Sequence, residues 1–239
     1  MTIEKESSLI PSNYVIASCK PWHKVSFELL VATTVGQWEF VTTADALSSA
    51  VLRLSPRYVF FLHWNWHVHS EIWVNYECVC FHMTDVPYGR GGSPLQNLIS
   101  LGNTQTMLSA LRMVEEMDAG PVYSKRPLSL IGRAEEIYHR AGDISFDIIR
   151  WMVETEPEPI PQVGEPVVFK RRKPEQSVLP LAGDLIRIYD HIRMLDAPTY
   201  PSAFLKYGNC CIEFVNADLR NEEIHANVVI RKNEGGHSK

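Results

Sequence analysis

The chain has 239 residues, of which 45% are hydrophobic and 21% are charged, so its length and composition predict one full globular domain or one domain with a small appendage. Its formal net charge of −5 argues against a dedicated nucleic-acid-binding protein, which would carry a net basic footprint. The absence of an apolar run of about 18 residues and of a secretory signal pattern predicts a cytoplasmic protein with no membrane partner.

The N-terminal part of the chain alternates short strands with helices. Strands are expected at 14–17, 38–41, 58–62 and 78–81, and helices at 25–31, 44–54 and 68–75. The segment 58–62 is apolar throughout, which is typical of a strand buried in a parallel sheet. This alternation predicts an α/β fold whose sheet is parallel at least in its centre.

The rest of the chain is expected to form a second series of elements. A loop is expected at 87–94, strands at 106–113 and 122–124, and helices at 94–101, 134–153 and 186–195. The segment 154–166, rich in proline and glutamate, is interpreted as a surface linker, and 203–215 as a hairpin that turns at Gly208 and Asn209. These elements predict an N-terminal domain at 1–168, a small C-terminal subdomain at 169–232 and a disordered tail at 233–239.

Aromatic and amide side chains follow the apolar segment 58–62. Trp64, Asn65 and Trp66 stand just after the carboxyl end of a predicted buried strand, where α/β sheets bind ligands. Their side chains suit a flat, polar heterocycle. Three histidines of the same stretch have no Asp or Cys at ligand spacing, so the segment predicts a cleft wall and no metal site.

His82 and Asp118 each lie where an expected strand meets a loop. Singly, a histidine at a strand end is more often structural than catalytic. Together the two suggest an acid–base pair, because a carboxylate beside an imidazole orients the ring for proton transfer. No serine stands in a nucleophile elbow, so acyl-enzyme chemistry has no support.

The segment 170–173 is a dense basic run that includes Arg171 and Arg172. Such a run is either a solvated surface segment or a contact for an anion such as a diphosphate, and the sequence leaves both open. The glycines at 89–92 lack the Lys-Ser/Thr ending of a phosphate loop, which favours an ordinary turn. Five cysteines, an odd number without zinc-ligand spacing, predict reduced thiols.

Four ordered motifs resemble the 10-formyltetrahydrofolate-dependent formyltransferase family, which includes methionyl-tRNA formyltransferase and the enzymes that formylate nucleotide-linked amino sugars. The motifs are 82–94 (HMTDVPYGRGGSP), 118–120 (DAG), 169–177 (FKRRKPEQS), and 192–198 with 201–204 (IRMLDAP, PSAF). The first resembles the family's signature loop, which begins with a histidine. Together they extend the resemblance over residues 14–220.

The resemblance implies a Rossmann-like, mostly parallel sheet flanked by helices, with a small C-terminal α+β subdomain. It implies N-formyl transfer from 10-formyltetrahydrofolate to an amine, catalysed by His82 and Asp118. The stretches 91–97 and 64–66 look most like the sugar branch linked to pseudaminic acid and like the gramicidin synthetase formylation domain. We therefore expect a uridine- or thymidine-linked amino sugar as acceptor, for surface glycan synthesis, with no nucleic acid partner; a homodimer stays open.

The same resemblance assigns the binding residues. Folate is expected against Trp64, Asn65, Trp66, Val114, Met117 and Asp118, and the sugar nucleotide against Tyr88, Arg90, Gly91, Arg171 and Arg172. The family's usual oxyanion-binding asparagine is replaced by Cys80, a weak donor, so Asn65 is the candidate substitute. Two alternatives remain: a methionyl-tRNA formyltransferase-like enzyme, or a non-catalytic relative that binds folate or a sugar.

Overall fold

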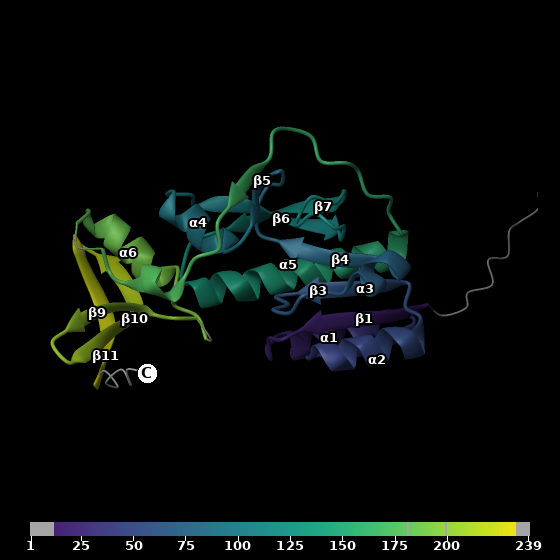
Figure 1. The fold of residues 1–239 in the computed structure, drawn as a ribbon, viewed down its shortest axis with the longest axis horizontal. Coiled ribbons are helices and arrows are strands. Elements are labelled where there is room, and N and C mark those ends of the chain that lie inside the picture. Colours follow the sequence, from purple (N-terminus) through teal and green to yellow (C-terminus); the bar gives the residue numbers. More distant parts are fainter. Residues whose placement is uncertain (1–11, 181, 199, 233–239) are drawn as a thin grey trace, which may run out of the picture. The chain divides into compact units, whose positions relative to one another are not determined.

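The computed structural model describes residues 12–180, 182–198 and 200–232. Its largest sheet has six strands in the order β2-β1-β3-β4-β6-β7 (Figure 1). These strands are β1 (Asn13–Ser18), β2 (Gln37–Val41), β3 (Tyr58–Leu62), β4 (Cys78–His82), β6 (Gln105–Arg112) and β7 (Val122–Ser129). Strands β1 to β4 pair in parallel and β4 pairs with β6 antiparallel, which confirms the predicted fold class.

Apolar side chains bury this sheet on both faces. All five residues of β3 are buried, as its uninterrupted apolar sequence predicts. Helix α2 (Ala44–Leu54) begins at Thr43, whose side chain accepts a hydrogen bond from Ala46 N, and its apolar face packs onto β1. Burying each large apolar side chain of that face contributes about 1.5–3 kcal/mol. Helices α1 (His23–Thr33) and α3 (Ser70–Asn75) complete the N-terminal series.

The described chain folds into two compact units that are interleaved along the sequence. Unit 1 comprises the described residues of Met1–His82, Leu108–Arg126 and Gly142–Gly164, and unit 2 those of Met83–Met107, Pro127–Ala141 and Glu165–Lys239. Helix α5 (Ala134–Thr155) contains one of the points where the chain passes between them. The sequential division at 168 and 169 remains a prediction.

Unit 2 contains two small sheets and two helices that matter for its binding surfaces. Strand β5 (Tyr88–Gly91) pairs in parallel with β8 (Val167–Phe169), followed by the 3-10 turn η1 (Pro174–Ser177). Helix α4 (Pro94–Ser100) follows β5, and helix α6 (Leu185–Arg193) lies against the antiparallel sheet β11-β10-β9 (Figure 1). That sheet consists of β9 (Ala203–Tyr207), β10 (Cys210–Arg220) and β11 (Glu223–Lys232).

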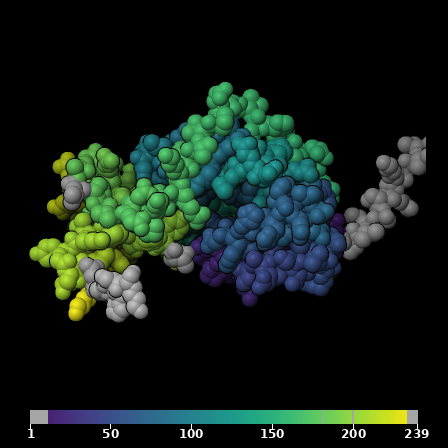
Figure 2. Space-filling view, viewed as in Figure 1, coloured from purple at the N-terminus to yellow at the C-terminus, as the bar shows by residue number. Residues whose placement is uncertain are grey.

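Two expectations need correction. The predicted loop 87–94 contains β5, whose glycines hide its strand character and whose partner β8 is remote in sequence. The predicted hairpin is confirmed with its turn at Gly208, but it continues into the unpredicted β11, an edge strand whose residues are mostly exposed. The predicted linker 154–166 begins only at 156, because α5 extends to Thr155; residues 156–166 lack helix and are mostly exposed (Figure 2, green). The predicted tail 233–239 lies outside the described residues. No helix of the described part is long and apolar enough to cross a membrane.

Candidate active site

His82 and Asp118 are brought together within unit 1. His82 is the last residue of β4 and is 8% exposed, and its Nδ1 lies 3.5 Å from Asp118 Oδ2. Both side chains are nearly buried, with 9% and 14% of their surface exposed. A carboxylate at this distance can orient the imidazole, which is an arrangement suited to general base catalysis.

The loop after β6 folds back to carry Asp118 toward β4. Its start is held by Met113 N, which donates to Cys78 O at 2.8 Å, and Asp118 itself has a left-handed backbone, with φ of 55°. Gly120 passes so close to β6 that a Cβ there would collide with Arg112 O. The loop therefore requires glycine at 120 and fixes the direction of the Asp118 side chain.

Gln162, which the sequence did not point to, holds this loop from the linker side. Its Nε2 donates to both Asp118 O and Gly120 O at 2.8 Å. A side chain that bridges two carbonyls of the turn stabilises the left-handed conformation at Asp118. Sequence alone carries no signal for this residue, because a lone glutamine in a proline-rich linker has the appearance of a solvated surface residue.

Replacing Gln162 with alanine should lower kcat/KM about tenfold to a hundredfold, because Asp118 loses the clamp that aims its carboxylate. The pH profile of kcat should also change, which a merely structural residue would not cause. Val163→Ala, at the 87% exposed neighbouring position, is the matched control and should keep wild-type kinetics. A Gln162→Ala enzyme with an unchanged rate and pH profile would show that the loop holds its shape unaided.

Cys80 lies two residues before His82 on β4 and packs against an apolar core cluster. Burial raises the pKa of its thiol, and the nearby Asp118 carboxylate raises it further. The thiol is therefore neutral at physiological pH, and its S–H is a weak hydrogen-bond donor. Because its thiol is neutral, we expect Cys80 to line the candidate site of His82 and Asp118 and not to act as a nucleophile.

Replacing Cys80 with alanine should therefore cost less than about tenfold in turnover, equivalent to roughly 1.4 kcal/mol. The same neutral thiol should react slowly with iodoacetamide near pH 7, compared with an unfolded control. Steady-state kinetics and mass spectrometry measure the two quantities. A loss of a hundredfold or more would mean that the thiol itself stabilises the reacting atoms.

The predicted folate-binding residues lie on two loops of unit 1. Trp64 packs edge-on against Phe61 and against Trp66, with ring centroids 6.0 and 4.8 Å apart. Its indole Nε1 is buried and has no hydrogen-bond partner among the described residues. Trp66 and Asn65 are exposed beside it. The exposed ring of Trp66 and the exposed amide of Asn65 suit a flat, polar heterocycle such as the pterin of a folate.

Val114 and Met117 lie exposed on the loop that carries Asp118, at 38% and 70% exposure. Apolar side chains held in solvent next to a catalytic loop offer contact area to a ligand. No hydrogen bond joins Asn65 and Cys80 in the described part of the chain, so the role of Asn65 as oxyanion donor stays a prediction. No group of three His, Cys, Asp or Glu in the described ranges could hold a metal ion.

The predicted acceptor-binding residues all belong to unit 2. Tyr88 on β5 packs edge-on against Phe169 at 5.4 Å, and Arg90 and Gly91 follow it on the same strand. Arg171 is exposed, and its backbone lies against Gly92 so closely that a Cβ there would collide. Arg172 is half-buried, and its main-chain N donates to Ser93 Oγ at 3.0 Å. The basic run therefore packs against the segment 91–97 and is hydrogen-bonded to it.

Comparisons with known proteins supply independent findings. A family model for the C-terminal domain of methionyl-tRNA formyltransferase matches residues 174–231. The solved structure of a methionyl-tRNA formyltransferase from Clostridium thermocellum is 43% identical, with a TM-score of 0.89, and the match covers 92% of this chain and 99% of that one. A curated methionyl-tRNA formyltransferase from Sorangium cellulosum is 28% identical over 152 residues, 61% of this chain and 48% of the relative. The chain thus spans about half the length, or less, of the curated relatives it matches.

A sugar enzyme is a much more distant match. The structure of a 4-N formyltransferase from Francisella tularensis is 11% identical, with a TM-score of 0.65, and the match covers 81% of this chain and 91% of that one. Such a likeness shows a shared fold alone. The expected sugar-nucleotide acceptor is therefore wrong, and the pseudaminic-acid assignment is overturned by the 43% identical relative.

The structure explains why the motif at 91–97 led to the wrong prediction of the acceptor. Asn97 Nδ2 donates to Gly92 O, Ser93 O and Lys170 O at 3.0–3.1 Å, and buried Gln96 bonds Tyr138 Oη and Met194 O. These side chains hold unit 2 together. The motif consequently reports the fold of this segment and carries no information about the acceptor.

Proposed function

Because the chain belongs to the formyltransferase family that includes methionyl-tRNA formyltransferase, we propose that it transfers a formyl group from 10-formyltetrahydrofolate to the amine of a methionyl-tRNA. The observation that carries this proposal is the 43% identity to the Clostridium thermocellum protein over 99% of that chain. The co-substrate, 10-formyltetrahydrofolate, is the one this family uses. The catalytic roles below rest on the 3.5 Å His82–Asp118 pair.

In the proposed reaction the neutral amine of the acceptor attacks the formyl carbon. The electron pair of the C=O bond moves to oxygen, and His82, oriented by Asp118, accepts the proton that the attacking nitrogen loses. The intermediate then collapses, the bond from carbon to the folate nitrogen breaks, and that nitrogen takes a proton. Holding both substrates in one site replaces a bimolecular encounter and is worth up to about 7–11 kcal/mol in well-oriented systems.

The developing oxyanion needs a donor, and the position usually occupied by asparagine holds Cys80. A neutral thiol contributes little, so the donor is proposed to be Asn65 or the protonated His82. The exposed Trp66 and Met117 are proposed to cover the pterin and exclude water from the formyl carbon.

Basic side chains of unit 2 support a nucleic-acid acceptor, which the net charge of the whole chain had argued against. None of the four residues of the run 170–173 forms an ion pair with a carboxylate among the described residues, and Lys170, Arg171 and Lys173 are exposed. Free surface cations next to one another can neutralise phosphates of RNA. A chain-wide charge of −5 averages over such a local patch and does not exclude it.

The test is a transfer assay with the purified chain, 10-formyltetrahydrofolate and methionyl-tRNA. We expect release of tetrahydrofolate together with a mass increase of one formyl group on methionine after the tRNA is hydrolysed. Uncharged tRNA and free methionine are the matched acceptors that lack the amine or the RNA, and both should react far more slowly.

Two results would contradict the proposal in different ways. If His82→Ala transfers formyl to methionyl-tRNA as fast as the wild type, the measured activity does not come from this site. If folate binds but no acceptor is formylated, the chain is a non-catalytic binding protein. The presence of Cys80 in place of the usual asparagine favours that alternative.

A further inference from the structure

Unit 2 contains a cavity of about 730 Å³ that shares only Arg172 with the basic run proposed to contact RNA. It is lined by residues 99–102 at the end of α4, by residues of α6, and by Arg172 and Gln176. Its volume falls within the range of about 300–1,000 Å³ that is usual for small-molecule sites. None of its lining residues is His82, Cys80 or Asp118.

Two arginines of this cavity carry charges that no carboxylate neutralises. The guanidinium of half-buried Arg172 donates one hydrogen bond to Gln176 O at 2.6 Å and forms no ion pair among the described residues. Arg187, in the first turn of α6, is exposed, and its guanidinium likewise forms no ion pair in the described ranges. Guanidinium groups with free N–H donors are the usual ligands of phosphate oxygens.

Of the two carboxylates that line the cavity, one is neutralised by an ion pair and the other caps a helix. Asp190 pairs with buried Arg193 at 2.6 Å, which neutralises it. Asp184 caps α6 by accepting a hydrogen bond from Arg187 N at 2.8 Å, and it is exposed. The first turn of α6 adds the positive end of its helix dipole on the same side. An anion entering the cavity therefore meets a local excess of positive charge.

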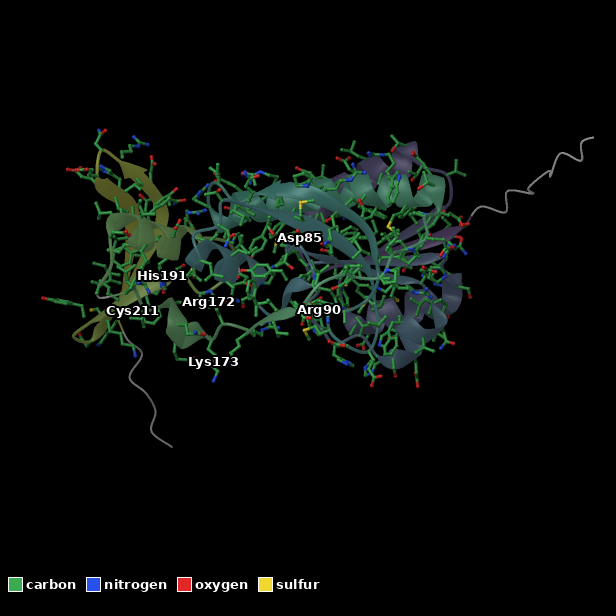
Figure 3. All side chains as sticks on the ribbon, turned by 90° about the horizontal axis from the view of Figure 1, so that it is seen from above. Asp85, Arg90, Arg172, Lys173, His191 and Cys211 are labelled. Carbon is green, nitrogen blue, oxygen red and sulfur yellow. The ribbon has the colours of Figure 1, made fainter. Side chains whose placement is uncertain are left out.

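His191 of α6 adds a third nitrogen group to the same wall. Its Nε2 is buried and has no hydrogen-bond partner among the described residues. Burial lowers the pKa of its imidazole, and Arg172 and Arg187 lower it further, so both guanidinium groups lie within electrostatic reach of one ring. Figure 3 shows Arg172 and His191 side by side, coming from the basic run and from α6.

Apolar side chains also line the cavity. Ile99 and Met194 are buried there, whereas Leu101 and Ile186 are 63% and 60% exposed. Large apolar side chains exposed at the mouth of a concave site are available to contact a ligand. A ligand that contacts both the arginines and the apolar side chains of the cavity has an anionic group and a flat or apolar body.

We propose that this cavity binds a small phosphorylated ligand of the nucleotide class, with its phosphate between Arg172 and Arg187 and its body against Leu101 and Ile186. A concave pocket of this size favours a small molecule. A long RNA strand would instead bind across an extended basic surface. The proposal concerns binding alone and does not depend on formyl transfer.

The experiment is a calorimetric titration of the full chain with adenosine monophosphate, with inorganic phosphate and with a short single-stranded RNA. We expect the mononucleotide to bind, and phosphate to bind more weakly. Arg172→Gln and Arg187→Gln should each weaken mononucleotide binding at least about tenfold. Arg171→Gln, which removes an adjacent exposed arginine outside the cavity, is the matched control and should change binding less than twofold.

A second readout follows the His191 imidazole by NMR as pH is varied. Bound phosphate offsets the repulsion from Arg172 and Arg187, while Asp184 and Asp190 stay engaged, so the pKa of His191 should rise when the mononucleotide binds. Because Arg187 is exposed, its variant is expected to fold even if Arg172→Gln does not. Equal binding by Arg187→Gln and wild type, an unmoved His191, or binding of the RNA alone would overturn the proposal.

Discussion

Replacing His82 with alanine should lower turnover by a factor of about a thousand or more, and replacing Asp118 with alanine should have a comparable effect. The physical reason is that the amine must lose a proton during attack, and a positioned acid–base group commonly contributes about 10²–10⁴-fold. The double variant should be little slower than either single one, because the pair acts as a unit. Steady-state formyl transfer at saturating folate measures all three rates.

Asp118→Asn separates charge from shape in this pair. The amide keeps the size of the carboxylate but does not stabilise a protonated imidazole, so most of the activity should still be lost. Unfolding curves that match the wild type would show that the loss is chemical. Near-full activity of Asp118→Asn would assign Asp118 a structural role and remove it from the mechanism.

Replacing Arg193 with alanine should destabilise the protein by about 3–5 kcal/mol, the cost expected when one partner of a buried ion pair is removed. Arg193 is 5% exposed, its Nε lies 2.6 Å from Asp190, and its guanidinium also donates to Leu130 O and Gly132 O at 2.6 and 2.8 Å. Its loss leaves a carboxylate and two carbonyl groups without their donor. The shift of the urea midpoint measures the effect.

An exposed ion pair of the same unit supplies the control for Arg193. Arg231 lies 3.3 Å from Glu213 on neighbouring strands of the C-terminal sheet, with 64% of its side chain exposed. Arg231→Ala should cost no more than about 1 kcal/mol, because water screens the pair. Equal midpoints for the two variants would show that the hydrogen bonds of Arg193 to the main chain contribute little.

The sequence predicts those helices and strands in which the apolar residues that become buried follow a regular pattern along the chain. The apolar run of β3 and the spaced apolar residues of α2 each have one strong pattern, and their bounds match the structure. The same holds for the turn at Gly208, where turn chemistry is local. These signals depend only on neighbouring residues, which is why they can be read without the tertiary structure.

The parts that escaped prediction depend on remote contacts. Strand β5 exists because β8 lies beside it, and the direction of Asp118 depends on the amide of Gln162. His82 and Asp118 could be named because they fall in motifs, but their 3.5 Å separation could not. The acceptor was misassigned because Gln96 and Asn97 serve packing, and a short motif does not distinguish packing from recognition.

The interleaving of the two units has a consequence for how the protein is made on the ribosome. Unit 1 includes Gly142–Gly164, and the clamp on Asp118 comes from Gln162, 44 residues later in the chain. Domains generally fold as units while synthesis proceeds from the N-terminus, so unit 1 stays incomplete until about two thirds of the chain has been translated. A nascent chain that already contains both His82 and Asp118 therefore still lacks the clamp on Asp118. The geometry of the candidate catalytic pair is therefore completed late in synthesis, and a product terminated before residue 162 lacks the hydrogen bonds that hold the Asp118 loop.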